Sequence, residues 1–353
     1  MLLHAPAYEA DAWRSVYRAL IDALGPNSAV TVLAEANADV DGLLDGRRAT
    51  TIKAPAGATL TAWARDALIA AGDTTDRPLF LATSALDRRD DAQAPALFAA
   101  ATGARLIPTG LPFEGGDILI DRDRVLVGAD SLRRIGRGDA HAGGRALAAM
   151  FASVDGRARA ILPVGGRPGP SETERPTDTP APGWTEVVGF GQRPDSRQPI
   201  FHIDMFVSLT GLDRDGRPIA LVGDHVLAAR ALGHAPLPHA TPDAFAAIAH
   251  DLRAAGYAVE RLPLPLLWTD DVVRRRRTWF FASYNNVLVA DGVVWLPEYG
   301  HDGWPEVDRT DKLAAAIWRR LGFEVRAVPG CLPLAENLGG LHCLANVIRR
   351  RPG

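Results

Sequence analysis

The C-terminal part of this chain carries a cysteine in a setting that could expose it to a ligand. Cys343 closes the segment Gly339-Gly340-Leu-His-Cys. Two adjacent glycines allow another group to approach the backbone closely, so they could form a mouth leading to the sulfur. Taken alone, Cys343 is better read as a small buried core residue, and Cys331 receives only that interpretation. A catalytic role for Cys343 therefore depends on finding a partner for it.

A candidate partner lies in the segment Phe201-His-Ile-Asp. His342 is adjacent to Cys343, but neighbours in a strand point to opposite faces, so we expect the acid/base group to come from elsewhere. His202 and Asp204 are two residues apart, which in a strand places both on one face and turns Ile203 to the core. A histidine and a carboxylate are costly to bury together unless they pair or meet a ligand. A structural pair and a catalytic pair fit this spacing equally well.

Two acidic segments complete the set of candidates. Glu114 and Asp117 flank two glycines in Phe-Glu-Gly-Gly-Asp, and Asp66 ends Trp-Ala-Arg-Asp. Acidic residues in front of a strand are often ordinary turn residues. Each segment alone is therefore a weak signal.

The elements that must position these residues follow a repeated pattern. A polar residue enters an apolar strand, a turn follows, and a second apolar strand returns, beginning at Asp117, Asp204 and Asn286. Asp291-Gly292 between two apolar runs is a strong hairpin signal. Asp66 begins a fourth copy, and residues 344–348 resemble a fifth whose second strand is missing. Helical periodicity accompanies the strands, most clearly over 241–256 and 308–322. The pattern predicts a radial array in which each copy brings its leading polar residue to the hub.

Length and composition limit the classes of function. The chain has 353 residues, is 47% hydrophobic and has a net charge of −3, which disfavours nucleic acid or an anionic membrane as a partner. Two cysteines do not make a disulfide framework, so a reducing cytoplasm fits. No apolar stretch approaches the ~18–20 residues that span a bilayer. We expect one catalytic domain over 1–353 with a Pro/Gly-rich loop insertion at about 165–199 beside the site.

Taken together and in order, the four motifs resemble the guanidino-group-modifying enzyme superfamily. This superfamily includes arginine, agmatine and peptidylarginine deiminases, dimethylarginine hydrolases and amidinotransferases. The resemblance covers residues 63–350. It implies an α/β fold, a five-bladed α/β propeller (the pentein fold) built from pseudo-fivefold ββαβ-type repeats, with the active site in the central pore. The chemistry that the resemblance implies requires no metal and no other cofactor.

The resemblance also implies a role for each motif residue. Cys343 matches the nucleophile, His202 the acid/base, and Glu114 the acid that supports the histidine. Asp66 and Asp204 match the carboxylates that hold the guanidinium, and Asp117 has a structural role at the glycine turn. Gly339 and Gly340 would form the approach to the thiolate. A guanidinium is a planar cation with several N–H donors, which two carboxylates can hold with its carbon against the sulfur.

The expected activity is hydrolysis of a guanidino group to a ureido group through a covalent thiouronium. The substrate is arginine, an arginine-like small molecule or a peptidyl arginine. Trp-Ala-Arg-Asp is followed by Ala-Leu-Ile and not by the Gly-Pro of typical agmatine deiminases, which weakens agmatine as the substrate.

Three alternatives stay open at this point. An amidinotransferase would use an amine acceptor in place of water. A binding protein on the same fold would not need the cysteine, and a metal site built from His202, Asp204, Glu114 and Cys343 would mix hard and soft ligands. The sequence is compatible with a homodimer.

Overall fold

The computed structural model describes most of the chain. The described residues are 1–7, 11–26, 28–44, 46–47, 49–72, 78–84, 88–156, 158–167, 173–191, 195–301 and 303–348. The expected insertion at about 165–199 therefore lies partly outside the described residues. Among the helices that are described, none is long and apolar enough to cross a lipid bilayer.

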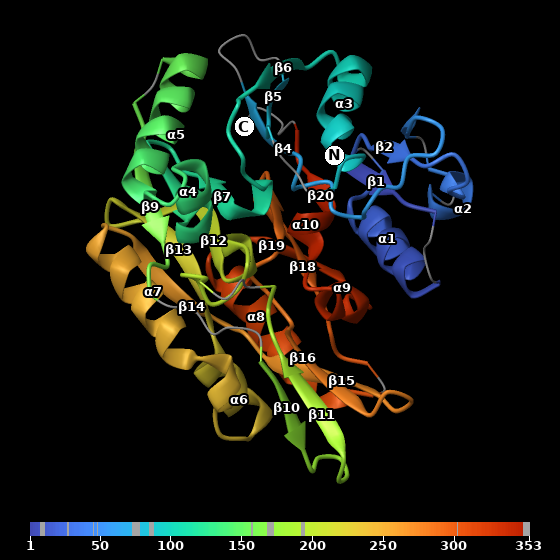
Figure 1. Ribbon diagram of the computed structural model, residues 1–353, viewed down its shortest axis with the longest axis vertical. Helices are drawn as coiled ribbons and strands as arrows, with labels where there is room; N and C mark the ends of the chain where they lie inside the picture. Colours follow the sequence, from blue (N-terminus) through green and yellow to red (C-terminus); the bar gives the residue numbers. More distant parts are fainter. Residues whose placement is uncertain are drawn as a thin grey trace.

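In the described residues, short strands make up six separate sheets (Figure 1). The strands are β1 (Leu2–Ala5), β2 (Thr31–Ala34), β3 (Thr50–Lys53), β4 (Leu68–Gly72), β5 (Pro78–Ala82), β6 (Arg105–Pro108), β7 (Ile118–Ile120), β8 (Arg124–Gly128), β9 (Ala160–Val164), β10 (Thr173–Thr177), β11 (Trp184–Val188), β12 (Val207–Arg214), β13 (Arg217–Asp224), β14 (Ala258–Pro263), β15 (Leu266–Asp271), β16 (Arg276–Phe281), β17 (Leu288–Ala290), β18 (Val293–Pro297), β19 (Glu324–Val328) and β20 (Ala345–Asn346).

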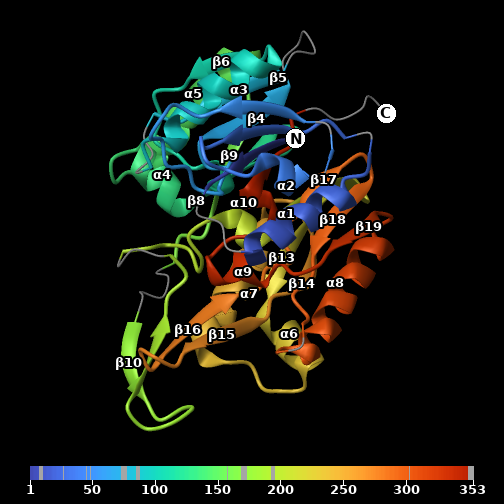
Figure 2. The same ribbon diagram turned by 90° about the vertical axis from the view of Figure 1, so that its right-hand side faces the viewer.

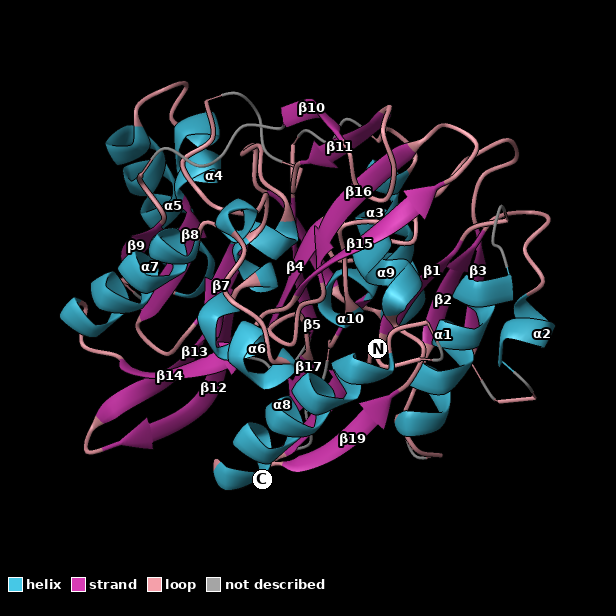
Figure 3. Cartoon of the chain, turned by 90° about the horizontal axis from the view of Figure 1, so that it is seen from below, coloured by secondary structure: helices cyan, strands magenta, loops and turns pink. Residues whose placement is uncertain are grey.

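Helices connect these strands and cover them from outside. The α-helices are α1 (Asp11–Ala23), α2 (Val40–Leu44), α3 (Ala94–Thr102), α4 (Ala129–Ile135), α5 (Ala140–Asp155), α6 (His225–Leu232), α7 (Pro242–Ala254), α8 (Asp308–Arg320), α9 (Leu332–Glu336) and α10 (Leu341–Leu344). Short 3-10 helices include η2 (Gly115–Asp117) and η3 (Ile203–Met205). Figure 3 shows α1, α5, α7 and α8 around the outside and β4, β5, β7 and β17 towards the middle. The predicted helices over 241–256 and 308–322 are confirmed as α7 and α8.

Five of the six sheets share one pattern of strand pairing. In each, a first strand pairs antiparallel with a second, and the second pairs parallel with a third that follows a helical crossover. The first strands are β4, β7, β12, β17 and β20, and their second strands are β5, β8, β13, β18 and β1. The third strands are β6, β9, β14, β19 and β2. A parallel connection needs a crossover of this length, which explains the ββαβ order.

The fifth unit is assembled from both ends of the sequence. The sequence predicted that residues 344–348 begin a repeat without a second strand. That second strand is β1, with Leu2 opposite Asn346 and Leu3 opposite Ala345. The N-terminal strand therefore holds the segment that carries Cys343.

Hydrogen bonds connect the turns in front of the five first strands in a closed circuit. Each joins one unit to the next: Arg65 N donates to Cys343 O (3.1 Å), Gly115 N to Asp66 O (3.1 Å), Ile203 N to Asp117 Oδ1 (3.2 Å), Ser283 Oγ to Met205 O (2.6 Å) and His342 N to Asn286 O (3.3 Å). The fold is mixed α/β and propeller-like. That the five sheets stand as five blades around one axis stays a prediction.

The sixth sheet corrects the expectation for residues 165–199. Its order is β10-β11-β16-β15, and β11 pairs parallel with β16. Part of the predicted loop is thus a β-hairpin, because Trp184-Thr-Glu-Val-Val has the β-branched and aromatic residues that suit a strand. Figure 2 shows β10, β15 and β16 extending from one end of the molecule.

The hydrophobic core lies between the helices and the sheets. Phe98 on α3, Phe245 on α7 and Trp318 on α8 are buried in this layer. Because the apolar helix faces are covered there, the inner ends of the strands are left for polar groups.

Candidate active site

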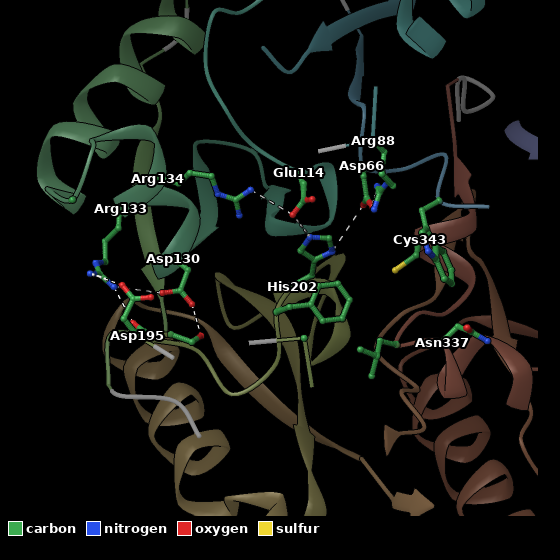
Figure 4. Close-up of a pocket in the computed structure, with 16 residues that line it drawn as sticks. Asp66, Arg88, Glu114, Asp130, Arg133, Arg134, Asp195, His202, Asn337 and Cys343 are labelled. Carbon is green, nitrogen blue, oxygen red and sulfur yellow. Dashed lines mark hydrogen bonds and ion pairs between the residues drawn. The ribbon is translucent and has the colours of Figure 1, made fainter. Parts of the chain in front are cut away.

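A cavity of about 500 Å³ opens beside the turns in front of β4, β7 and β12 and beside α10 (Figure 4). We call it the front cavity. It is lined by Trp63, Asp66, Arg88, Glu114, Asp130, Arg133, Arg134, Gly138, Gly191, Asp195, Ser196, Phe201, His202, Asn337, Leu338 and Cys343. Four of the sequence-predicted site residues are among them, namely Cys343, His202, Glu114 and Asp66.

Cys343 lies in the short helix α10, and an asparagine holds it. Asn286 Nδ2 donates to Cys343 Sγ (3.2 Å), while Asn286 Oδ1 accepts from the backbone N–H groups of His342 (2.8 Å) and Cys343 (3.1 Å). Burial and the carboxylates of Asp204 and Asp66 raise the pKa of Cys343 to about 11, although His202 acts in the opposite direction. Without a bound cation the sulfur is therefore a thiol near neutral pH.

The glycines before Cys343 serve close packing. A Cβ on Gly340 would lie 2.6 Å from Asn286 Oδ1, and one on Gly339 would lie 2.3 Å from the Trp63 ring. Gly340, predicted to contact substrate, is not among the residues that line the front cavity. Its missing side chain lets Asn286 reach the N-terminus of α10.

His202 points into the front cavity from the residue before η3. Its Nε2 lies 3.0 Å from Glu114 Oε2 and its Nδ1 lies 3.9 Å from Asp66 Oδ1. Burial disfavours the charged ring, but hydrogen bonds to Cys343 and Glu114 and the charge of Asp66 outweigh it and raise the pKa of His202 well above its usual value. Figure 4 shows Cys343 Sγ turned towards this ring. The geometry suits an imidazolium that faces the thiol.

The two predicted guanidinium-binding carboxylates are each anchored by one oxygen only. Asp66 Oδ2 accepts from Arg88 Nη2 (2.5 Å), and Asp204 Oδ2 lies 2.7 Å from His342 Nδ1 and 4.0 Å from Cys343 Sγ. Within the described part of the chain, Asp66 Oδ1 and Asp204 Oδ1 are buried acceptors without a hydrogen-bond partner. Unpaired buried acceptors are costly, so this set is prepared for a ligand that donates hydrogen bonds.

Glu114 and Asp117 both support His202, in different ways. Burial would raise the pKa of Glu114, but the hydrogen bond and charge of His202 and the charge of Arg134 (3.5 Å) lower it to about 2. Asp117 is buried and binds Ser131 Oγ (2.6 Å) as well as the N–H of Ile203. It therefore fixes the turn that carries His202, in line with its predicted structural role.

The local structure at His202 differs from the predicted strand. Ile203–Met205 form a 3-10 helix, so His202 and Asp204 do not share one face of a strand. His202 lines the front cavity, whereas Asp204 lines a second cavity on the other side of Cys343. They still converge, because a Cβ on Gly116 would lie 2.6 Å from His202 Nδ1 and 3.0 Å from Asp204 Oδ2. Ile203 is buried, as predicted.

Sequence reasoning missed several residues of the site. Asn286 was identified as the leading residue of a repeat but received no role. Arg88, Arg133 and Arg134 line the front cavity, and no motif marks them. In the described part of the chain, no group of three or more histidine, cysteine or acidic side chains is arranged to hold a metal ion.

Comparisons with known proteins agree with this architecture. A model of the Porphyromonas-type peptidyl-arginine deiminase family matches residues 236–348. A solved structure provisionally described as a peptidyl-arginine deiminase has a TM-score of 0.67 and 17% identity, over 97% of this chain and 93% of that chain. No curated protein matches the sequence.

Two agmatine deiminases are also similar in structure. A C. jejuni enzyme, solved as a cysteine-to-serine variant with substrate bound, has a TM-score of 0.65 and 15% identity, over 97% of this chain and 90% of that chain. The Enterococcus faecalis enzyme has a TM-score of 0.60 and 13% identity, over 97% and 91%. These likenesses establish the fold, and with the family match they confirm the resemblance to the guanidino-modifying superfamily.

Proposed function

We propose that this protein is a cysteine-dependent hydrolase that converts the guanidino group of an arginine-like substrate to a ureido group. One observation carries the proposal: buried, unpaired acceptors on Asp66 and Asp204 flank the Cys343 thiol and the His202 ring. A guanidinium supplies planar N–H donors for the unpaired carboxylate oxygens. Its positive charge also balances the negative charge of the two carboxylates. The similarity to agmatine and peptidyl-arginine deiminase structures supports the same chemistry.

The bound cation would also activate the nucleophile. Burial and two carboxylates hold the pKa of Cys343 at about 11, so the free thiol is a weak nucleophile. A guanidinium between those carboxylates cancels their charge at the sulfur, so the thiol releases its proton to water and the thiolate is favoured. Binding of the substrate thus lowers the pKa of the thiol that attacks it.

The reaction then proceeds in two halves. The thiolate adds to the guanidinium carbon, and the imidazolium of His202 gives a proton to the departing nitrogen, so ammonia leaves and a thiouronium remains on Cys343. Water adds to the same carbon while neutral His202 accepts its proton. The carbon–sulfur bond breaks, the leaving thiolate takes up the hydroxyl proton of the adduct, and the ureido product forms with the Cys343 thiol restored.

The charges at the mouth favour a substrate that carries a carboxylate or carbonyl oxygen. Arg133 is bound to Asp195 (3.1 Å), but the polar contact found for Arg134 in the described residues is the 3.5 Å pair with Glu114. Arg134 keeps donors for a substrate oxygen. Arginine offers such an oxygen, and agmatine, which is arginine without the carboxylate, does not.

The test is ureido formation from a panel of guanidines, with Cys343→Ala as the control. Arginine and agmatine form a matched pair, and Arg134→Met should lower kcat/KM for arginine about tenfold or more relative to kcat/KM for agmatine. Amine acceptors in a second arm detect amidino transfer. Cys343-independent turnover, or no product from any guanidine in either arm, would overturn the proposal.

A further inference from the structure

A second cavity, of about 310 Å³, lies on the other side of the Cys343 turn, and we call it the rear cavity. Residues of β4, β7, β12 and β17, together with Val347 after β20, line it. Most of these side chains are aliphatic. Arg65, His342 and Asp204 are exceptions that meet one another at the turn.

The three side chains form a chain of hydrogen bonds with a fixed direction. Arg65 Nη2 contacts His342 Nε2, and His342 Nδ1 lies 2.7 Å from Asp204 Oδ2. A guanidinium has donors only, so Nε2 of His342 must carry the lone pair. The proton then sits on Nδ1 and is donated to Asp204. The arrangement is self-consistent only for a neutral imidazole of this one tautomer.

We propose that Arg65 and His342 are positioning residues that act on Asp204 from the rear cavity. Arg65 fixes the neutral Nδ1–H tautomer of His342, and His342 holds Asp204 Oδ2 beside Cys343 Sγ without cancelling the carboxylate charge. Asp204 therefore keeps its charge for a cation in front of the sulfur. The inference rests on the proposed function, because it assigns a purpose to Asp204 as a cation-binding group.

Arg65 is tied to the same turn through the backbone. Its N–H donates to Cys343 O (3.1 Å), and its Nε donates to His342 O (3.4 Å). The ionisable groups that face His342 are Arg65, Asp204, His202 and the neighbouring Cys343. Burial first and then the charge of Arg65 lower the pKa of His342, which agrees with a neutral ring.

The first test reads the ring itself and needs no substrate. In ¹⁵N-histidine-labelled protein, His342 should give the neutral Nδ1–H pattern from pH 6 to pH 8. In Arg65→Met, which keeps the length of the stem, Nε2 is released, and the pKa of His342 should rise because the charge of Arg65 no longer opposes the contact with Asp204. An Nε2–H tautomer or an imidazolium in the unmodified protein at pH 7 would overturn the proposal.

The second test compares two alkylating reagents that differ in charge. Chloroacetamidine is a cation and chloroacetamide is neutral, and both transfer their carbon to Cys343 with loss of chloride. At pH 6, Arg65→Met should lower the chloroacetamidine rate about tenfold relative to the chloroacetamide rate, because a protonated His342 neutralises Asp204. An unchanged ratio would overturn the proposal, and it would do so whether or not any guanidine is a substrate.

A conservative variant separates positioning from a structural effect. In His342→Asn, Nδ2 stands where the imidazole Nδ1 stands and the side chain cannot be protonated. The double variant Arg65→Met/His342→Asn should therefore recover the preference for the cationic reagent at pH 6. If both variants lose alkylation by neutral chloroacetamide together with the preference for chloroacetamidine, the two residues only hold the turn, and the proposal is wrong.

Discussion

Glu114 lies between two cations, and this position controls the proton on His202. Its Oε2 is 3.0 Å from His202 Nε2 and 3.5 Å from Arg134 Nη1. Because these contacts hold its pKa at about 2, Glu114 stays ionised across the working range of pH. A fixed anion at this distance favours the imidazolium.

Replacing that anion should shift the pH dependence of the reaction. Glu114→Gln keeps the shape but removes the charge, so the pKa of His202 should fall. The enzyme form with protonated His202 is then lost at a lower pH. The decline of kcat/KM on the basic side of its pH profile therefore begins at a lower pH. Glu186→Gln, at a carboxylate paired with Arg175 outside the cavity lining, is the matched control. A basic limb that does not move would contradict this role of Glu114.

Asn286 should set the reactivity of the thiol. Its Nδ2 lies 3.2 Å from Cys343 Sγ, so Asn286→Asp puts a carboxylate oxygen where a donor was. The pKa of Cys343 should rise further, and alkylation by chloroacetamide at pH 8 should slow about tenfold. Asn337→Asp makes the same change of charge at the lining of the front cavity and is the control. Equal slowing in both variants would show a general charge effect instead.

The 3-10 turns η2 and η3 pack against each other at the inner ends of β7 and β12, and one glycine makes this possible. A Cβ at Gly116 would lie 2.6 Å from His202 Nδ1. Gly116→Ala should therefore push the ring aside and lower kcat at least 100-fold, since misplacement by about 1 Å can cost that much.

A glycine in α5 provides the control for this substitution. A Cβ at Gly144 would be 3.9 Å from its nearest neighbour, an ordinary contact, so Gly144→Ala should leave activity unchanged and stabilise the helix by about 0.5–1 kcal/mol. Steady-state kinetics and urea unfolding of both variants check the pair. Normal turnover by Gly116→Ala would mean that His202 is not held in the way described.

The sequence predicted the repeated elements well because their signals are local. The Asp291-Gly292 turn has φ of 51° and 74°, as a two-residue hairpin turn requires. The helices α7 and α8 follow from apolar periodicity. The strand assigned to His202 and Asp204 is wrong, since η3 depends on Asp117 binding the N–H of Ile203 from a distant segment.

The motif residues of the site were predictable in kind, whereas their partners were not. Asp66, Glu114, His202 and Cys343 stand in ordered motifs and meet in the front cavity. Arg88 and Arg134 come from segments without a motif, and only tertiary distances identify them. His342 was set aside as a base because of strand alternation. Its contact with Asp204 agrees with that exclusion, although the segment is a helix.

At the scale of the whole molecule, the pairing of β1 with β20 completes the fifth unit from the two ends of the sequence. Leu3 is fully buried in the largest core cluster and stands opposite Ala345. Leu3→Ala should cost about 3 kcal/mol of stability. It should also speed hydrogen exchange over residues 341–346 and lower kcat, because Cys343 loses its support. Leu212→Ala, at a side chain that is 37% exposed, should do neither. Slow exchange at 341–346 in Leu3→Ala would contradict this link.

The same pairing determines when, during synthesis of the chain, the segment with Cys343 is held in place. Chains are made from the N-terminus, and segments distant in sequence meet late and slowly in folding. Asp66, Glu114 and His202 are synthesised well before Cys343. The segment of α10 and β20 is not held until β20 has been synthesised and has paired with β1. A nascent chain therefore holds the residues proposed to bind the cation before it holds the proposed nucleophile, whose segment is fixed last, when β20 pairs with β1.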